Sequence, residues 1–407
     1  MRIFISTGEV SGDLQGALLA SALTRQAQKQ GLDLTMVGLG GDRMAAAGVD
    51  LVAHTTAISG FGILESLPVV LPAVQARRKA EQDIQDYPPD LLILIDYEGF
   101  NSGLGAYCKR LFPQTPVVYY IAPQLWVWNP FPGKAEILVQ LCDRIFAIFP
   151  EEARYFADLG AKVTWVGHPL LDRMTTAPSR AVARERLGIP AEQTAIALVP
   201  ASRPQEIKTL WPIIAAAAQG IQATQPGVKF WIPVSVPAFR PALEGAIAQY
   251  GLKAEIVEGN SLDILAAADL AITKSGTVSL ELALLNIPQV VVYRMTWLTM
   301  WVARRFFNFN LPYVSPANLL LMENIVPELI QENATPSKMI AESLALLNQP
   351  QRREQMRRDY ARMRLQMGEL GVCDRTAAGI LDLIPLPIKR GEGFFAPTDS
   401  SHFPLGL

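Results

Sequence analysis

The chain has 407 residues, and 36 Lys and Arg residues against 38 Asp and Glu residues give a formal net charge of −2. Half of the residues are hydrophobic and 18% are charged, which excludes a disordered chain and a protein that holds nucleic acid by charge alone. The three cysteines are widely spaced, so neither a disulfide framework nor a cysteine-based zinc site is expected. The length favours two domains, and the composition is typical of a cytosolic enzyme.

We expect no signal peptide, because Gly8 and Glu9 interrupt the apolar run that follows Met1. No stretch of the sequence reaches the roughly 18 consecutive apolar residues that a membrane-spanning helix needs. The apolar fraction is nevertheless high for a cytosolic enzyme.

Short apolar runs alternate with helical patterns along most of the chain. A helix is predicted over residues 13–29, where small and apolar residues recur at helical spacing. Apolar runs separated by helices indicate parallel sheets that are covered on both faces. The predicted strands are residues 2–6, 34–37, 91–95, 117–121, 145–149 and 163–166 in the first half, and 195–199, 230–233, 256–257, 270–273 and 290–293 in the second half.

The alternation of strands and helices is interrupted over residues 169–190, where prolines and charged residues are frequent. This interruption divides the chain into two similar α/β halves. Ligands of open α/β sheets bind at the carboxyl ends of the strands, so we sought candidate site residues directly after each strand. The predicted units are two Rossmann-like domains over residues 1–170 and 193–340 that face each other across a cleft, a linker over 171–192, C-terminal helices over 341–385 with one helix over 343–363, and a flexible tail over 386–407.

The first motif is Gly8-Glu9-Val10-Ser11-Gly12-Asp13, which follows the first strand and opens a helix. Its glycines let the backbone approach a ligand closely. A capped turn would account for Ser11 or Asp13, but it does not require Glu9 at the edge of the cleft.

Asp96 follows the strand over residues 91–95, and a carboxylate there is unfavourable to bury unpaired. At the carboxyl end of the strand it faces the cleft and can take a proton from a substrate hydroxyl. The alternative is a helix cap by Asp96 or Asn101.

Two motifs of the second half suit phosphate binding. Arg203 lies where a strand meets a helix, and its guanidinium matches the geometry of an oxyanion, although a surface pair with Glu206 is the alternative. The stretch 273–281 leads from a strand through Ser275, Gly276 and Thr277 into a helix, whose free N–H groups can bind an anion. Glu281 lies one helical turn after Thr277 and could bind a sugar hydroxyl. The alternative is an ordinary capped helix whose positive end stabilises the negative charge of Glu281.

Aromatic and basic residues are interleaved over 293–309, and apolar residues 64–74 precede a basic run in the same way. Such segments resemble helices that lie at a membrane surface or line an acyl-chain groove, while a core helix is the alternative. Contact with a membrane surface, or an acyl-chain groove, would also account for the high apolar fraction. The residues concerned are Trp297, Met300, Trp301, Arg304, Arg305, Phe306, Phe307 and Phe309 in the second half, and Arg77, Arg78 and Lys79 in the first.

His54, His168 and His402 show no metal-binding spacing. His168 follows a strand and could line the cleft, although a lone histidine often has a structural role.

Taken together, these residues resemble the lipid-A-disaccharide synthase family (glycosyltransferase family 19), which are inverting, two-domain glycosyltransferases of the GT-B type. The resemblance covers residues 2–380, and the ordered set of motifs is more specific than any one of them. The matching segments are residues 8–13, 37–44, 62–65, 95–96, 100–101, 126–128, 166–169, 198–203, 275–281, 293–294, 313–315 and 318–320.

The resemblance implies a reaction that joins UDP-2,3-diacylglucosamine to 2,3-diacylglucosamine 1-phosphate, giving a β-1,6-linked disaccharide 1-phosphate and UDP in lipid A biosynthesis. It implies that Asp96 is the general base for the acceptor 6-hydroxyl, that Glu9 is catalytic with it, and that Arg203 binds the diphosphate. No cofactor or metal is implied, because Arg and fixed dipoles would stabilise the departing diphosphate. The other implied substrate-binding residues are Ser11, Gly12, Ser275, Gly276, Thr277, Glu281 and Asn318.

The resemblance also implies a peripheral protein on the cytoplasmic face of the inner membrane, without a nucleic-acid partner, and it allows a homodimer that exchanges its C-terminal segments. The sequence departs from the usual family pattern after Asp96, where residues 97–99 replace Ala-Pro-Asp, after Arg203, at residues 204–205, and at residues 129 and 321–324. Asn129 and Glu323 each stand where the family usually has Arg, and Asn324 stands where it usually has Glu. Two alternatives therefore stay open, namely another UDP-sugar transferase or epimerase of the same fold, and a non-catalytic homologue that binds a nucleotide sugar or lipid.

Overall fold

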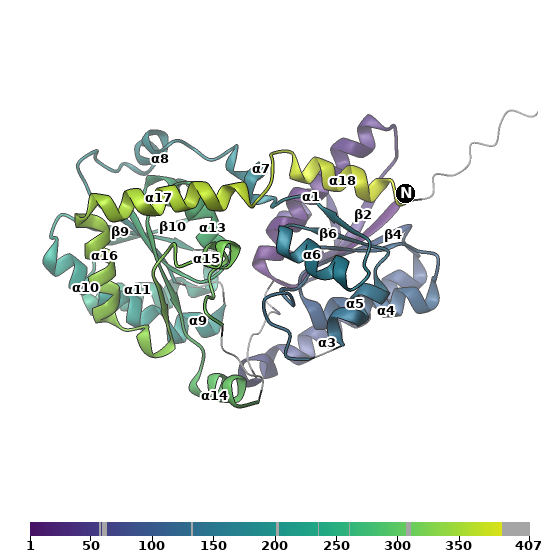
Figure 1. Ribbon diagram of the computed structural model, residues 1–407, viewed down its shortest axis with the longest axis horizontal. Coiled ribbons are helices and arrows are strands. Elements are labelled where there is room, and N and C mark those ends of the chain that lie inside the picture. The colour runs from purple at the N-terminus through teal and green to yellow at the C-terminus, as the bar shows by residue number, and fades with distance from the viewer. Residues whose placement is uncertain are drawn as a thin grey trace, which may run out of the picture.

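The computed structural model describes residues 1–56, 58, 63–131, 133–200, 203–234, 236–259, 261–306 and 311–384. The described residues form two α/β domains that lie beside each other, with helices on both faces of each sheet (Figure 1). The N-terminal domain contains β1 (Arg2–Ser6), α1 (Val10–Lys29), β2 (Thr35–Gly40), α2 (Asp42–Ala46), β3 (Val49–His54), α3 (Ile63–Asp86), β4 (Leu91–Ile95), α4 (Glu98–Leu111), β5 (Val117–Tyr120), α5 (Lys134–Leu141), β6 (Arg144–Ala147), α6 (Pro150–Asp158) and β7 (Val163–Trp165).

The second half of the chain follows the same alternation. Its elements are α7 (Leu170–Met174), α8 (Arg180–Leu187), β8 (Ala195–Val199), α9 (Pro204–Thr209), α10 (Trp211–Thr224), β9 (Lys229–Val234), η1 (Pro237–Phe239), α11 (Arg240–Tyr250), β10 (Ala254–Glu258), α12 (Ser261–Ala267), β11 (Leu270–Lys274), α13 (Thr277–Leu284), β12 (Gln289–Tyr293), α14 (Trp297–Phe306), α15 (Pro316–Leu321), β13 (Glu328–Ile330), η2 (Gln331–Asn333), α16 (Pro336–Asn348), α17 (Pro350–Leu365) and α18 (Val372–Leu381).

The two sheets have matching topologies. The seven strands of the first are ordered β3-β2-β1-β4-β5-β6-β7, and the six strands of the second are ordered β10-β9-β8-β11-β12-β13. All pairings are parallel, and the central strand β4 is buried along its whole length, as its continuous apolar sequence requires. The strand order reverses between β1 and β4 and between β8 and β11, which is where open α/β sheets bind ligands.

The chain passes between the domains twice, and the two passages touch. The backbone N–H of His168 donates to the carbonyl of Met367 at 2.8 Å. Gly167 and Gly368 both have a φ of 89°, and a Cβ on Gly167 would lie 2.7 Å from that carbonyl oxygen, so glycine is required here. The Asp172 carboxylate then accepts the backbone N–H groups of Gly371 and Cys373, at 2.6 and 2.7 Å, at the start of α18.

The last helix of the described chain returns to the first domain. α16 and α17 pack on the C-terminal domain, whereas α18 packs along α1 (Figure 1). Gly379 of α18 faces the buried ring of Phe146 in β6. The core of the N-terminal domain is therefore completed by residues from the end of the chain.

Most predicted elements are confirmed, and the exceptions have local causes. The helix predicted over 343–363 is two helices, because Pro350 lacks an amide hydrogen and disfavours helical backbone before it. β2 continues to Gly40 instead of stopping at Val37, since Gly38 permits a close approach to the carbonyl of Ile5. The edge strands β3 and β13 were missed, and the predicted linker contains α7 and α8, of which α8 packs against α12.

Several sequence-based expectations fall outside the described residues. The tail over 386–407 and the residues Phe307 and Phe309 are among them, and so are the side chains of residues 64–69. Within the described chain, no helix combines the length and the hydropathy that crossing a membrane requires.

The return of α18 can be tested with a pair of glycine substitutions. A Cβ on Gly379 would lie 2.9 Å from the Phe146 ring, so we expect Gly379→Ala to lower the free energy of unfolding by about 1–3 kcal/mol. Gly245 lies within α11 with no atom near its missing Cβ, so Gly245→Ala should raise that free energy by about 0.5–1 kcal/mol. Urea unfolding of both variants measures the difference, and two equal shifts would contradict the packing of α18.

Candidate active site

An ion pair connects the two domains at their strand ends. Glu9 precedes α1 and Arg203 precedes α9, so each lies directly after the first strand of its sheet. Nη2 of Arg203 donates to both carboxylate oxygens of Glu9, at 2.8 and 2.6 Å. The structure thus brings together two residues that are 194 positions apart in the sequence.

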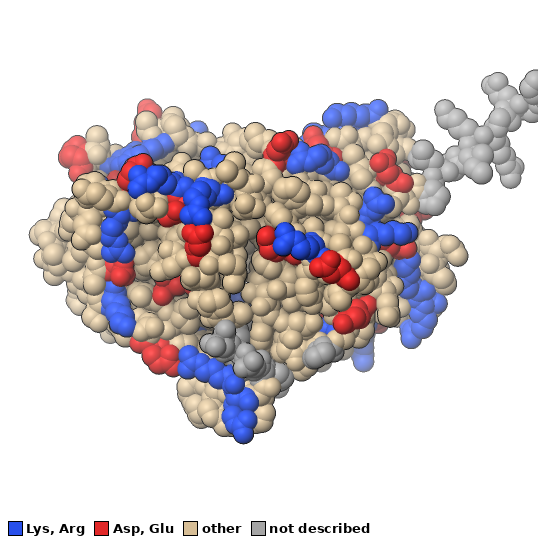
Figure 2. Space-filling model, viewed as in Figure 1, with Lys and Arg blue, Asp and Glu red and all other residues tan. Residues whose placement is uncertain are grey.

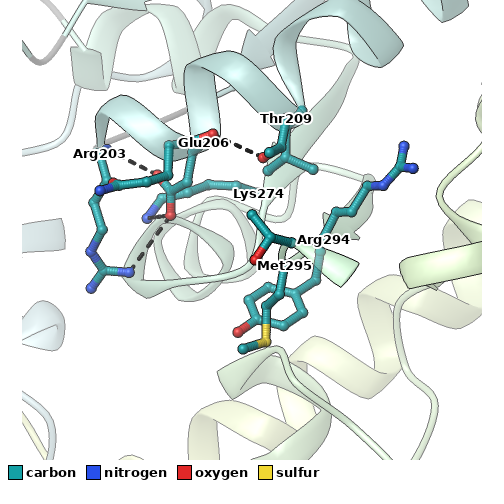
Figure 3. Close-up of a pocket in the computed structure, with 10 residues that line it drawn as sticks. Arg203, Glu206, Thr209, Lys274, Arg294 and Met295 are labelled. Atoms are coloured by element: carbon teal, nitrogen blue, oxygen red, sulfur yellow. Dashed lines mark hydrogen bonds and ion pairs between the residues drawn. The ribbon is translucent and has the colours of Figure 1, made fainter. Parts of the chain in front are cut away.

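Arg203 continues this charge network into the C-terminal domain. Its Nη1 lies 3.7 Å from Oε1 of Glu206, and the same oxygen lies 3.2 Å from Nζ of Lys274. Figure 3 shows these three side chains together at one wall of a pocket, while the Arg294 side chain extends away from them. The sequence left open whether Arg203 binds a phosphate or pairs with Glu206. The pair with Glu206 is present, but Arg203 also reaches across to Glu9 of the other domain.

The pocket beside this network suits an anion. It has a volume of about 510 Å³ and is lined by Arg203, Lys274, Tyr293 and Arg294 among others. Burial lowers the pKa of Lys274 from its ordinary value, although the neighbouring carboxylate of Glu206 opposes this. An incoming phosphate would favour the charged ammonium in the same way.

Asp96 lies in a strained turn at the end of β4. Asp96 and Tyr97 both have left-handed backbone, with φ of 48° and 50°, which is unfavourable for residues other than glycine. The Asp96 carbonyl accepts hydrogen bonds from Nδ2 of Asn101 at 2.8 Å and from the hydroxyl of Tyr119 at 2.7 Å. Neither Asp96 nor Asn101 caps α4, so the helix-cap alternative is wrong; Tyr97 is the cap residue and makes no side-chain cap bond.

The surroundings of Asp96 raise the pKa of its carboxyl group toward neutral pH. Burial raises the pKa of Asp96 to about 7, and the nearby negative charge of Glu9 adds to this effect. A backbone hydrogen bond from Tyr97 and the positive charge of Arg203 act in the opposite direction. A carboxylate with this pKa can accept a proton efficiently near neutral pH.

A second pocket, of about 500 Å³, lies between the domains below Asp96. The N-terminal domain contributes Ser11, Gly12 and Asp96 to its wall, and the C-terminal domain contributes Thr277 from the start of α13. Gly12 is required for this packing, because a Cβ there would lie 1.8 Å from Oγ1 of Thr7. Four of the residues predicted from sequence thus meet around one cavity.

Other predicted residues have partners within the protein. Glu281 is paired with Arg173 of α7, a residue for which the sequence carried no motif. Oγ of Ser275 donates to the carbonyl of Val314 at 2.7 Å, and Gly276 immediately precedes α13. The Ser275 side chain and the Glu281 carboxylate therefore hold neighbouring segments in place around the start of α13.

Asn318 does not join the pocket residues. It is fully buried, and its Oδ1 accepts the backbone N–H groups of Ile325 and Val326, each at 2.9 Å. Its Nδ2 donates to the Val326 carbonyl at 3.0 Å and to Glu328 at 2.8 Å. These contacts organise the loop that follows α15.

Residues 129, 323 and 324, which differ from the usual family pattern, also interact with side chains of this protein. Glu323 forms an ion pair with Arg362 of α17, at 2.5 Å, on the surface. Asn129 donates a hydrogen bond to the Tyr155 hydroxyl at 3.3 Å, and Asn324 accepts a long one from Asn318. Among the residues that the structure describes, no cluster of three or more His, Cys, Asp or Glu side chains could hold a metal ion.

The matching sheets and the site between them define a two-domain protein of the GT-B type, and solved structures bear out this fold. A UDP-GlcNAc 2-epimerase from Neisseria meningitidis bound to UDP-GlcNAc has a TM-score of 0.64 at 12% identity, covering 94% of this chain and 99% of that chain. MurG from Acinetobacter baumannii has a TM-score of 0.53 at 15% identity, with coverages of 94% and 99%.

Sequence comparison identifies the family. The family model described as lipid-A-disaccharide synthetase matches residues 3–381. A lipid-A-disaccharide synthase from Gloeothece citriformis is 55% identical over 94% of this chain and 100% of its own length, and one from a Synechocystis strain is 50% identical over 94% and 98%. The chain therefore belongs to the lipid-A-disaccharide synthase family, which are glycosyltransferases of lipid A biosynthesis, and the resemblance seen in the sequence is confirmed.

The titration of Asp96 provides a test of the site. If its carboxylate is the active base, kcat/KM should fall as the pH drops through about 7, because the protonated acid cannot accept a proton. Glu9→Gln removes a negative charge that raises the pKa of Asp96, so the acid limb should move to lower pH. Asp42→Asn, a change at an exposed carboxylate, is the control. An acid limb that moves to higher pH in Glu9→Gln would contradict the assignment.

Proposed function

We propose that this protein is an inverting glycosyltransferase that joins UDP-2,3-diacylglucosamine to 2,3-diacylglucosamine 1-phosphate, with UDP as the leaving group. The observation that carries the proposal is the half-buried carboxyl group of Asp96 at the wall of the cleft, which has a pKa of about 7 and lies near the positive charge of Arg203. A single displacement with inversion needs one base for the attacking hydroxyl and a cationic site for the departing phosphate. Asp96 supports the first role, and Arg203 with Lys274 supports the second.

In this reaction the 6-hydroxyl of the acceptor attacks C1 of the donor sugar from the face opposite the diphosphate. The hydroxyl proton passes to the Asp96 carboxylate as the new C1–O6 bond forms. The bond from C1 to the phosphate oxygen breaks, and its electron pair leaves with UDP. Arg203 and Lys274 offset the negative charge that develops on the diphosphate. Thr277, the first residue of α13, lines the neighbouring pocket beside Asp96.

Glu9 interacts with both groups that carry out the proposed chemistry, Arg203 and Asp96. Without substrate it pairs with Arg203 and raises the pKa of Asp96. A diphosphate that binds Arg203 would compete with this ion pair, because both present oxyanions to the same guanidinium. We propose that Glu281, held by Arg173, and Thr277 face the nucleotide from α13.

The first experiment measures UDP release by the full chain in mixed micelles, with UDP-2,3-diacylglucosamine alone and with 2,3-diacylglucosamine 1-phosphate added. We expect release that depends on the acceptor, together with a disaccharide product. Release without acceptor would favour a hydrolase, and conversion of the UDP-sugar into its epimer without net UDP release would favour an epimerase. UDP binding without either reaction would favour a non-catalytic homologue. Activity that is independent of detergent or lipid would favour a soluble UDP-sugar transferase.

Replacing the base tests the mechanism itself. Asp96→Asn keeps the size of the side chain but removes its basicity, so we expect turnover to fall by about 100-fold or more. Asp158→Asn, at an exposed carboxylate at the end of α6, should leave turnover unchanged. Near-normal turnover in a folded Asp96→Asn variant would defeat the assignment of the base.

We further propose that the protein binds the cytoplasmic surface of the inner membrane through α14. Trp297, Trp301 and Phe306 of this helix are exposed, and Arg304 and Arg305 lie beside them. Figure 2 shows Lys and Arg side chains gathered at the tip of the molecule where α14 lies. Large apolar groups next to cations are typical of helices that bind anionic lipid surfaces. α3 offers Val70, Leu71 and Val74 in the same manner, followed by Arg77, Arg78 and Lys79.

Vesicle binding tests this surface. Trp297 is 78% exposed on α14, and Leu365 is 79% exposed at the end of α17. We expect Trp297→Gln combined with Trp301→Gln to weaken sedimentation with anionic vesicles by about tenfold or more, since two aromatic groups leave the lipid boundary. Leu365→Gln removes an equally exposed apolar side chain elsewhere and should not change binding. Equal losses in both variants would refute a specific role of α14.

A further inference from the structure

The cavity between the domains has a polar wall that the proposed proton transfer does not use. His168 lies just after β7, is only 4% exposed, and lines the same pocket as Asp96. Its Nδ1 accepts the backbone N–H of Leu170 at 3.2 Å, and its ring packs against Phe149 with centroids 5.3 Å apart. The imidazole is therefore fixed in one orientation by two contacts within the protein.

These contacts determine where the proton of the ring resides. Burial lowers the pKa of His168 to about 3, so the ring is neutral at physiological pH. Since Nδ1 accepts a hydrogen bond, the single proton must be on Nε2. Nε2 makes no hydrogen bond to any residue in the described part of the chain. His168 thus carries a fixed hydrogen-bond donor at the cavity wall.

A second buried polar group lines the same cavity. Gln15 lies in the second turn of α1 and is also only 4% exposed. Its Oε1 is buried, and it has no hydrogen-bond partner among the described residues. A buried acceptor without a partner is unfavourable by about 1–3 kcal/mol, and native structures usually satisfy such groups. The pocket that Gln15 lines is the place from which a ligand can supply the missing donor.

The charges around the cavity indicate which kind of ligand belongs there. Among the described residues that line it there is no Lys or Arg, and the one charged side chain is the carboxylate of Asp96. A phosphate group is therefore disfavoured here and belongs with Arg203 and Lys274 in the neighbouring pocket. The rest of the wall mixes apolar side chains such as Phe149 and Leu280 with uncharged polar ones, Ser11, Gln124 and Thr277, which suits the carbon faces and hydroxyls of a sugar ring.

We propose that His168 and Gln15 form a specificity subsite that binds one ring hydroxyl of a hexosamine substrate. A hydroxyl placed between the two residues would accept the hydrogen bond from Nε2 of His168 and donate its own proton to Oε1 of Gln15, both of which line this pocket. The subsite rests on the proposed function for the identity of the sugars, and either the donor or the acceptor sugar can supply the hydroxyl. A site built to hydrogen-bond a substrate hydroxyl discriminates strongly against an analogue that lacks it.

The test compares natural sugars with deoxy analogues in variants of the subsite. Gln15→Met and His168→Phe remove one polar partner each while nearly keeping its volume, and Gln28→Met, an exposed position on α1, is the control. Calorimetry measures Kd for UDP, for the UDP-sugar and its 4-deoxy and 6-deoxy forms, and for the acceptor and its 4-deoxy form. Steady-state kinetics measure kcat/KM for the same sugars.

We expect the wild-type chain to prefer one natural sugar over one deoxy analogue by about tenfold or more. Gln15→Met and His168→Phe should each bring that ratio close to one, with the Kd for UDP unchanged. The sugar concerned, donor or acceptor, identifies the source of the hydroxyl. Gln15→Met should also unfold at the same temperature as the wild type or a higher one, because it removes an unpaired buried acceptor.

A merely structural role would lower binding of the natural and deoxy sugars by the same factor, and an unchanged ratio in Gln15→Met therefore overturns the proposal. If His168→Phe fails to fold, Gln15→Met alone decides the question. Wild-type protein that binds the sugars without releasing UDP would refute the proposed function, while the ratios of Kd would still test the subsite.

Discussion

The ion pair between Glu9 and Arg203 determines the electrostatics of the whole cleft. Its two residues precede α1 and α9, the helices that follow equivalent strands of the two sheets. A single nitrogen of Arg203, Nη2, donates to both carboxylate oxygens of Glu9, and the two side chains stay about one-quarter exposed, at 22% and 24%. Partial exposure makes the desolvation penalty smaller than that of a fully buried ion pair, and it leaves Arg203 accessible to another oxyanion. The negative charge of Glu9 raises the pKa of Asp96, and the positive charge of Arg203 lowers it.

Asp96, the proposed base, lies in a strained backbone turn that the rest of the domain stabilises. Two successive left-handed residues, Asp96 and Tyr97, are unfavourable by about 1–3 kcal/mol each. Asn101 and Tyr119 bind the carbonyl of Asp96, and a Cβ on Gly8 would collide with the Tyr97 ring. Such a turn persists only when its surroundings leave no alternative. It directs the Asp96 carboxylate into the space between the domains, which an ordinary helix cap would not do.

The sequence was most informative where structure follows from local pattern. Apolar runs between helices predicted both parallel sheets, and the rule that ligands bind at strand ends led to Glu9, Asp96, Arg203 and Thr277, which do lie around the cleft. It was least informative where a side chain meets a partner far along the chain. Arg173 and Glu281 are 108 residues apart, and Tyr119 reaches Asp96 from a neighbouring strand. No local spacing encodes these contacts. The order of the motifs, by contrast, was enough to indicate the family.

The return of α18 to the N-terminal domain has a consequence for how the protein is made. The strands of that domain end at Trp165, but the helix that covers α1 begins only at Val372. A ribosome that adds about 5–20 residues per second needs about 10–40 s to synthesise the intervening segment of about 200 residues. During that time the growing chain exposes the apolar surface on α1 that α18 covers in the folded protein. Packing of the first domain is thus completed only once α18 has been synthesised, and until then the exposed surface makes the nascent chain prone to aggregation.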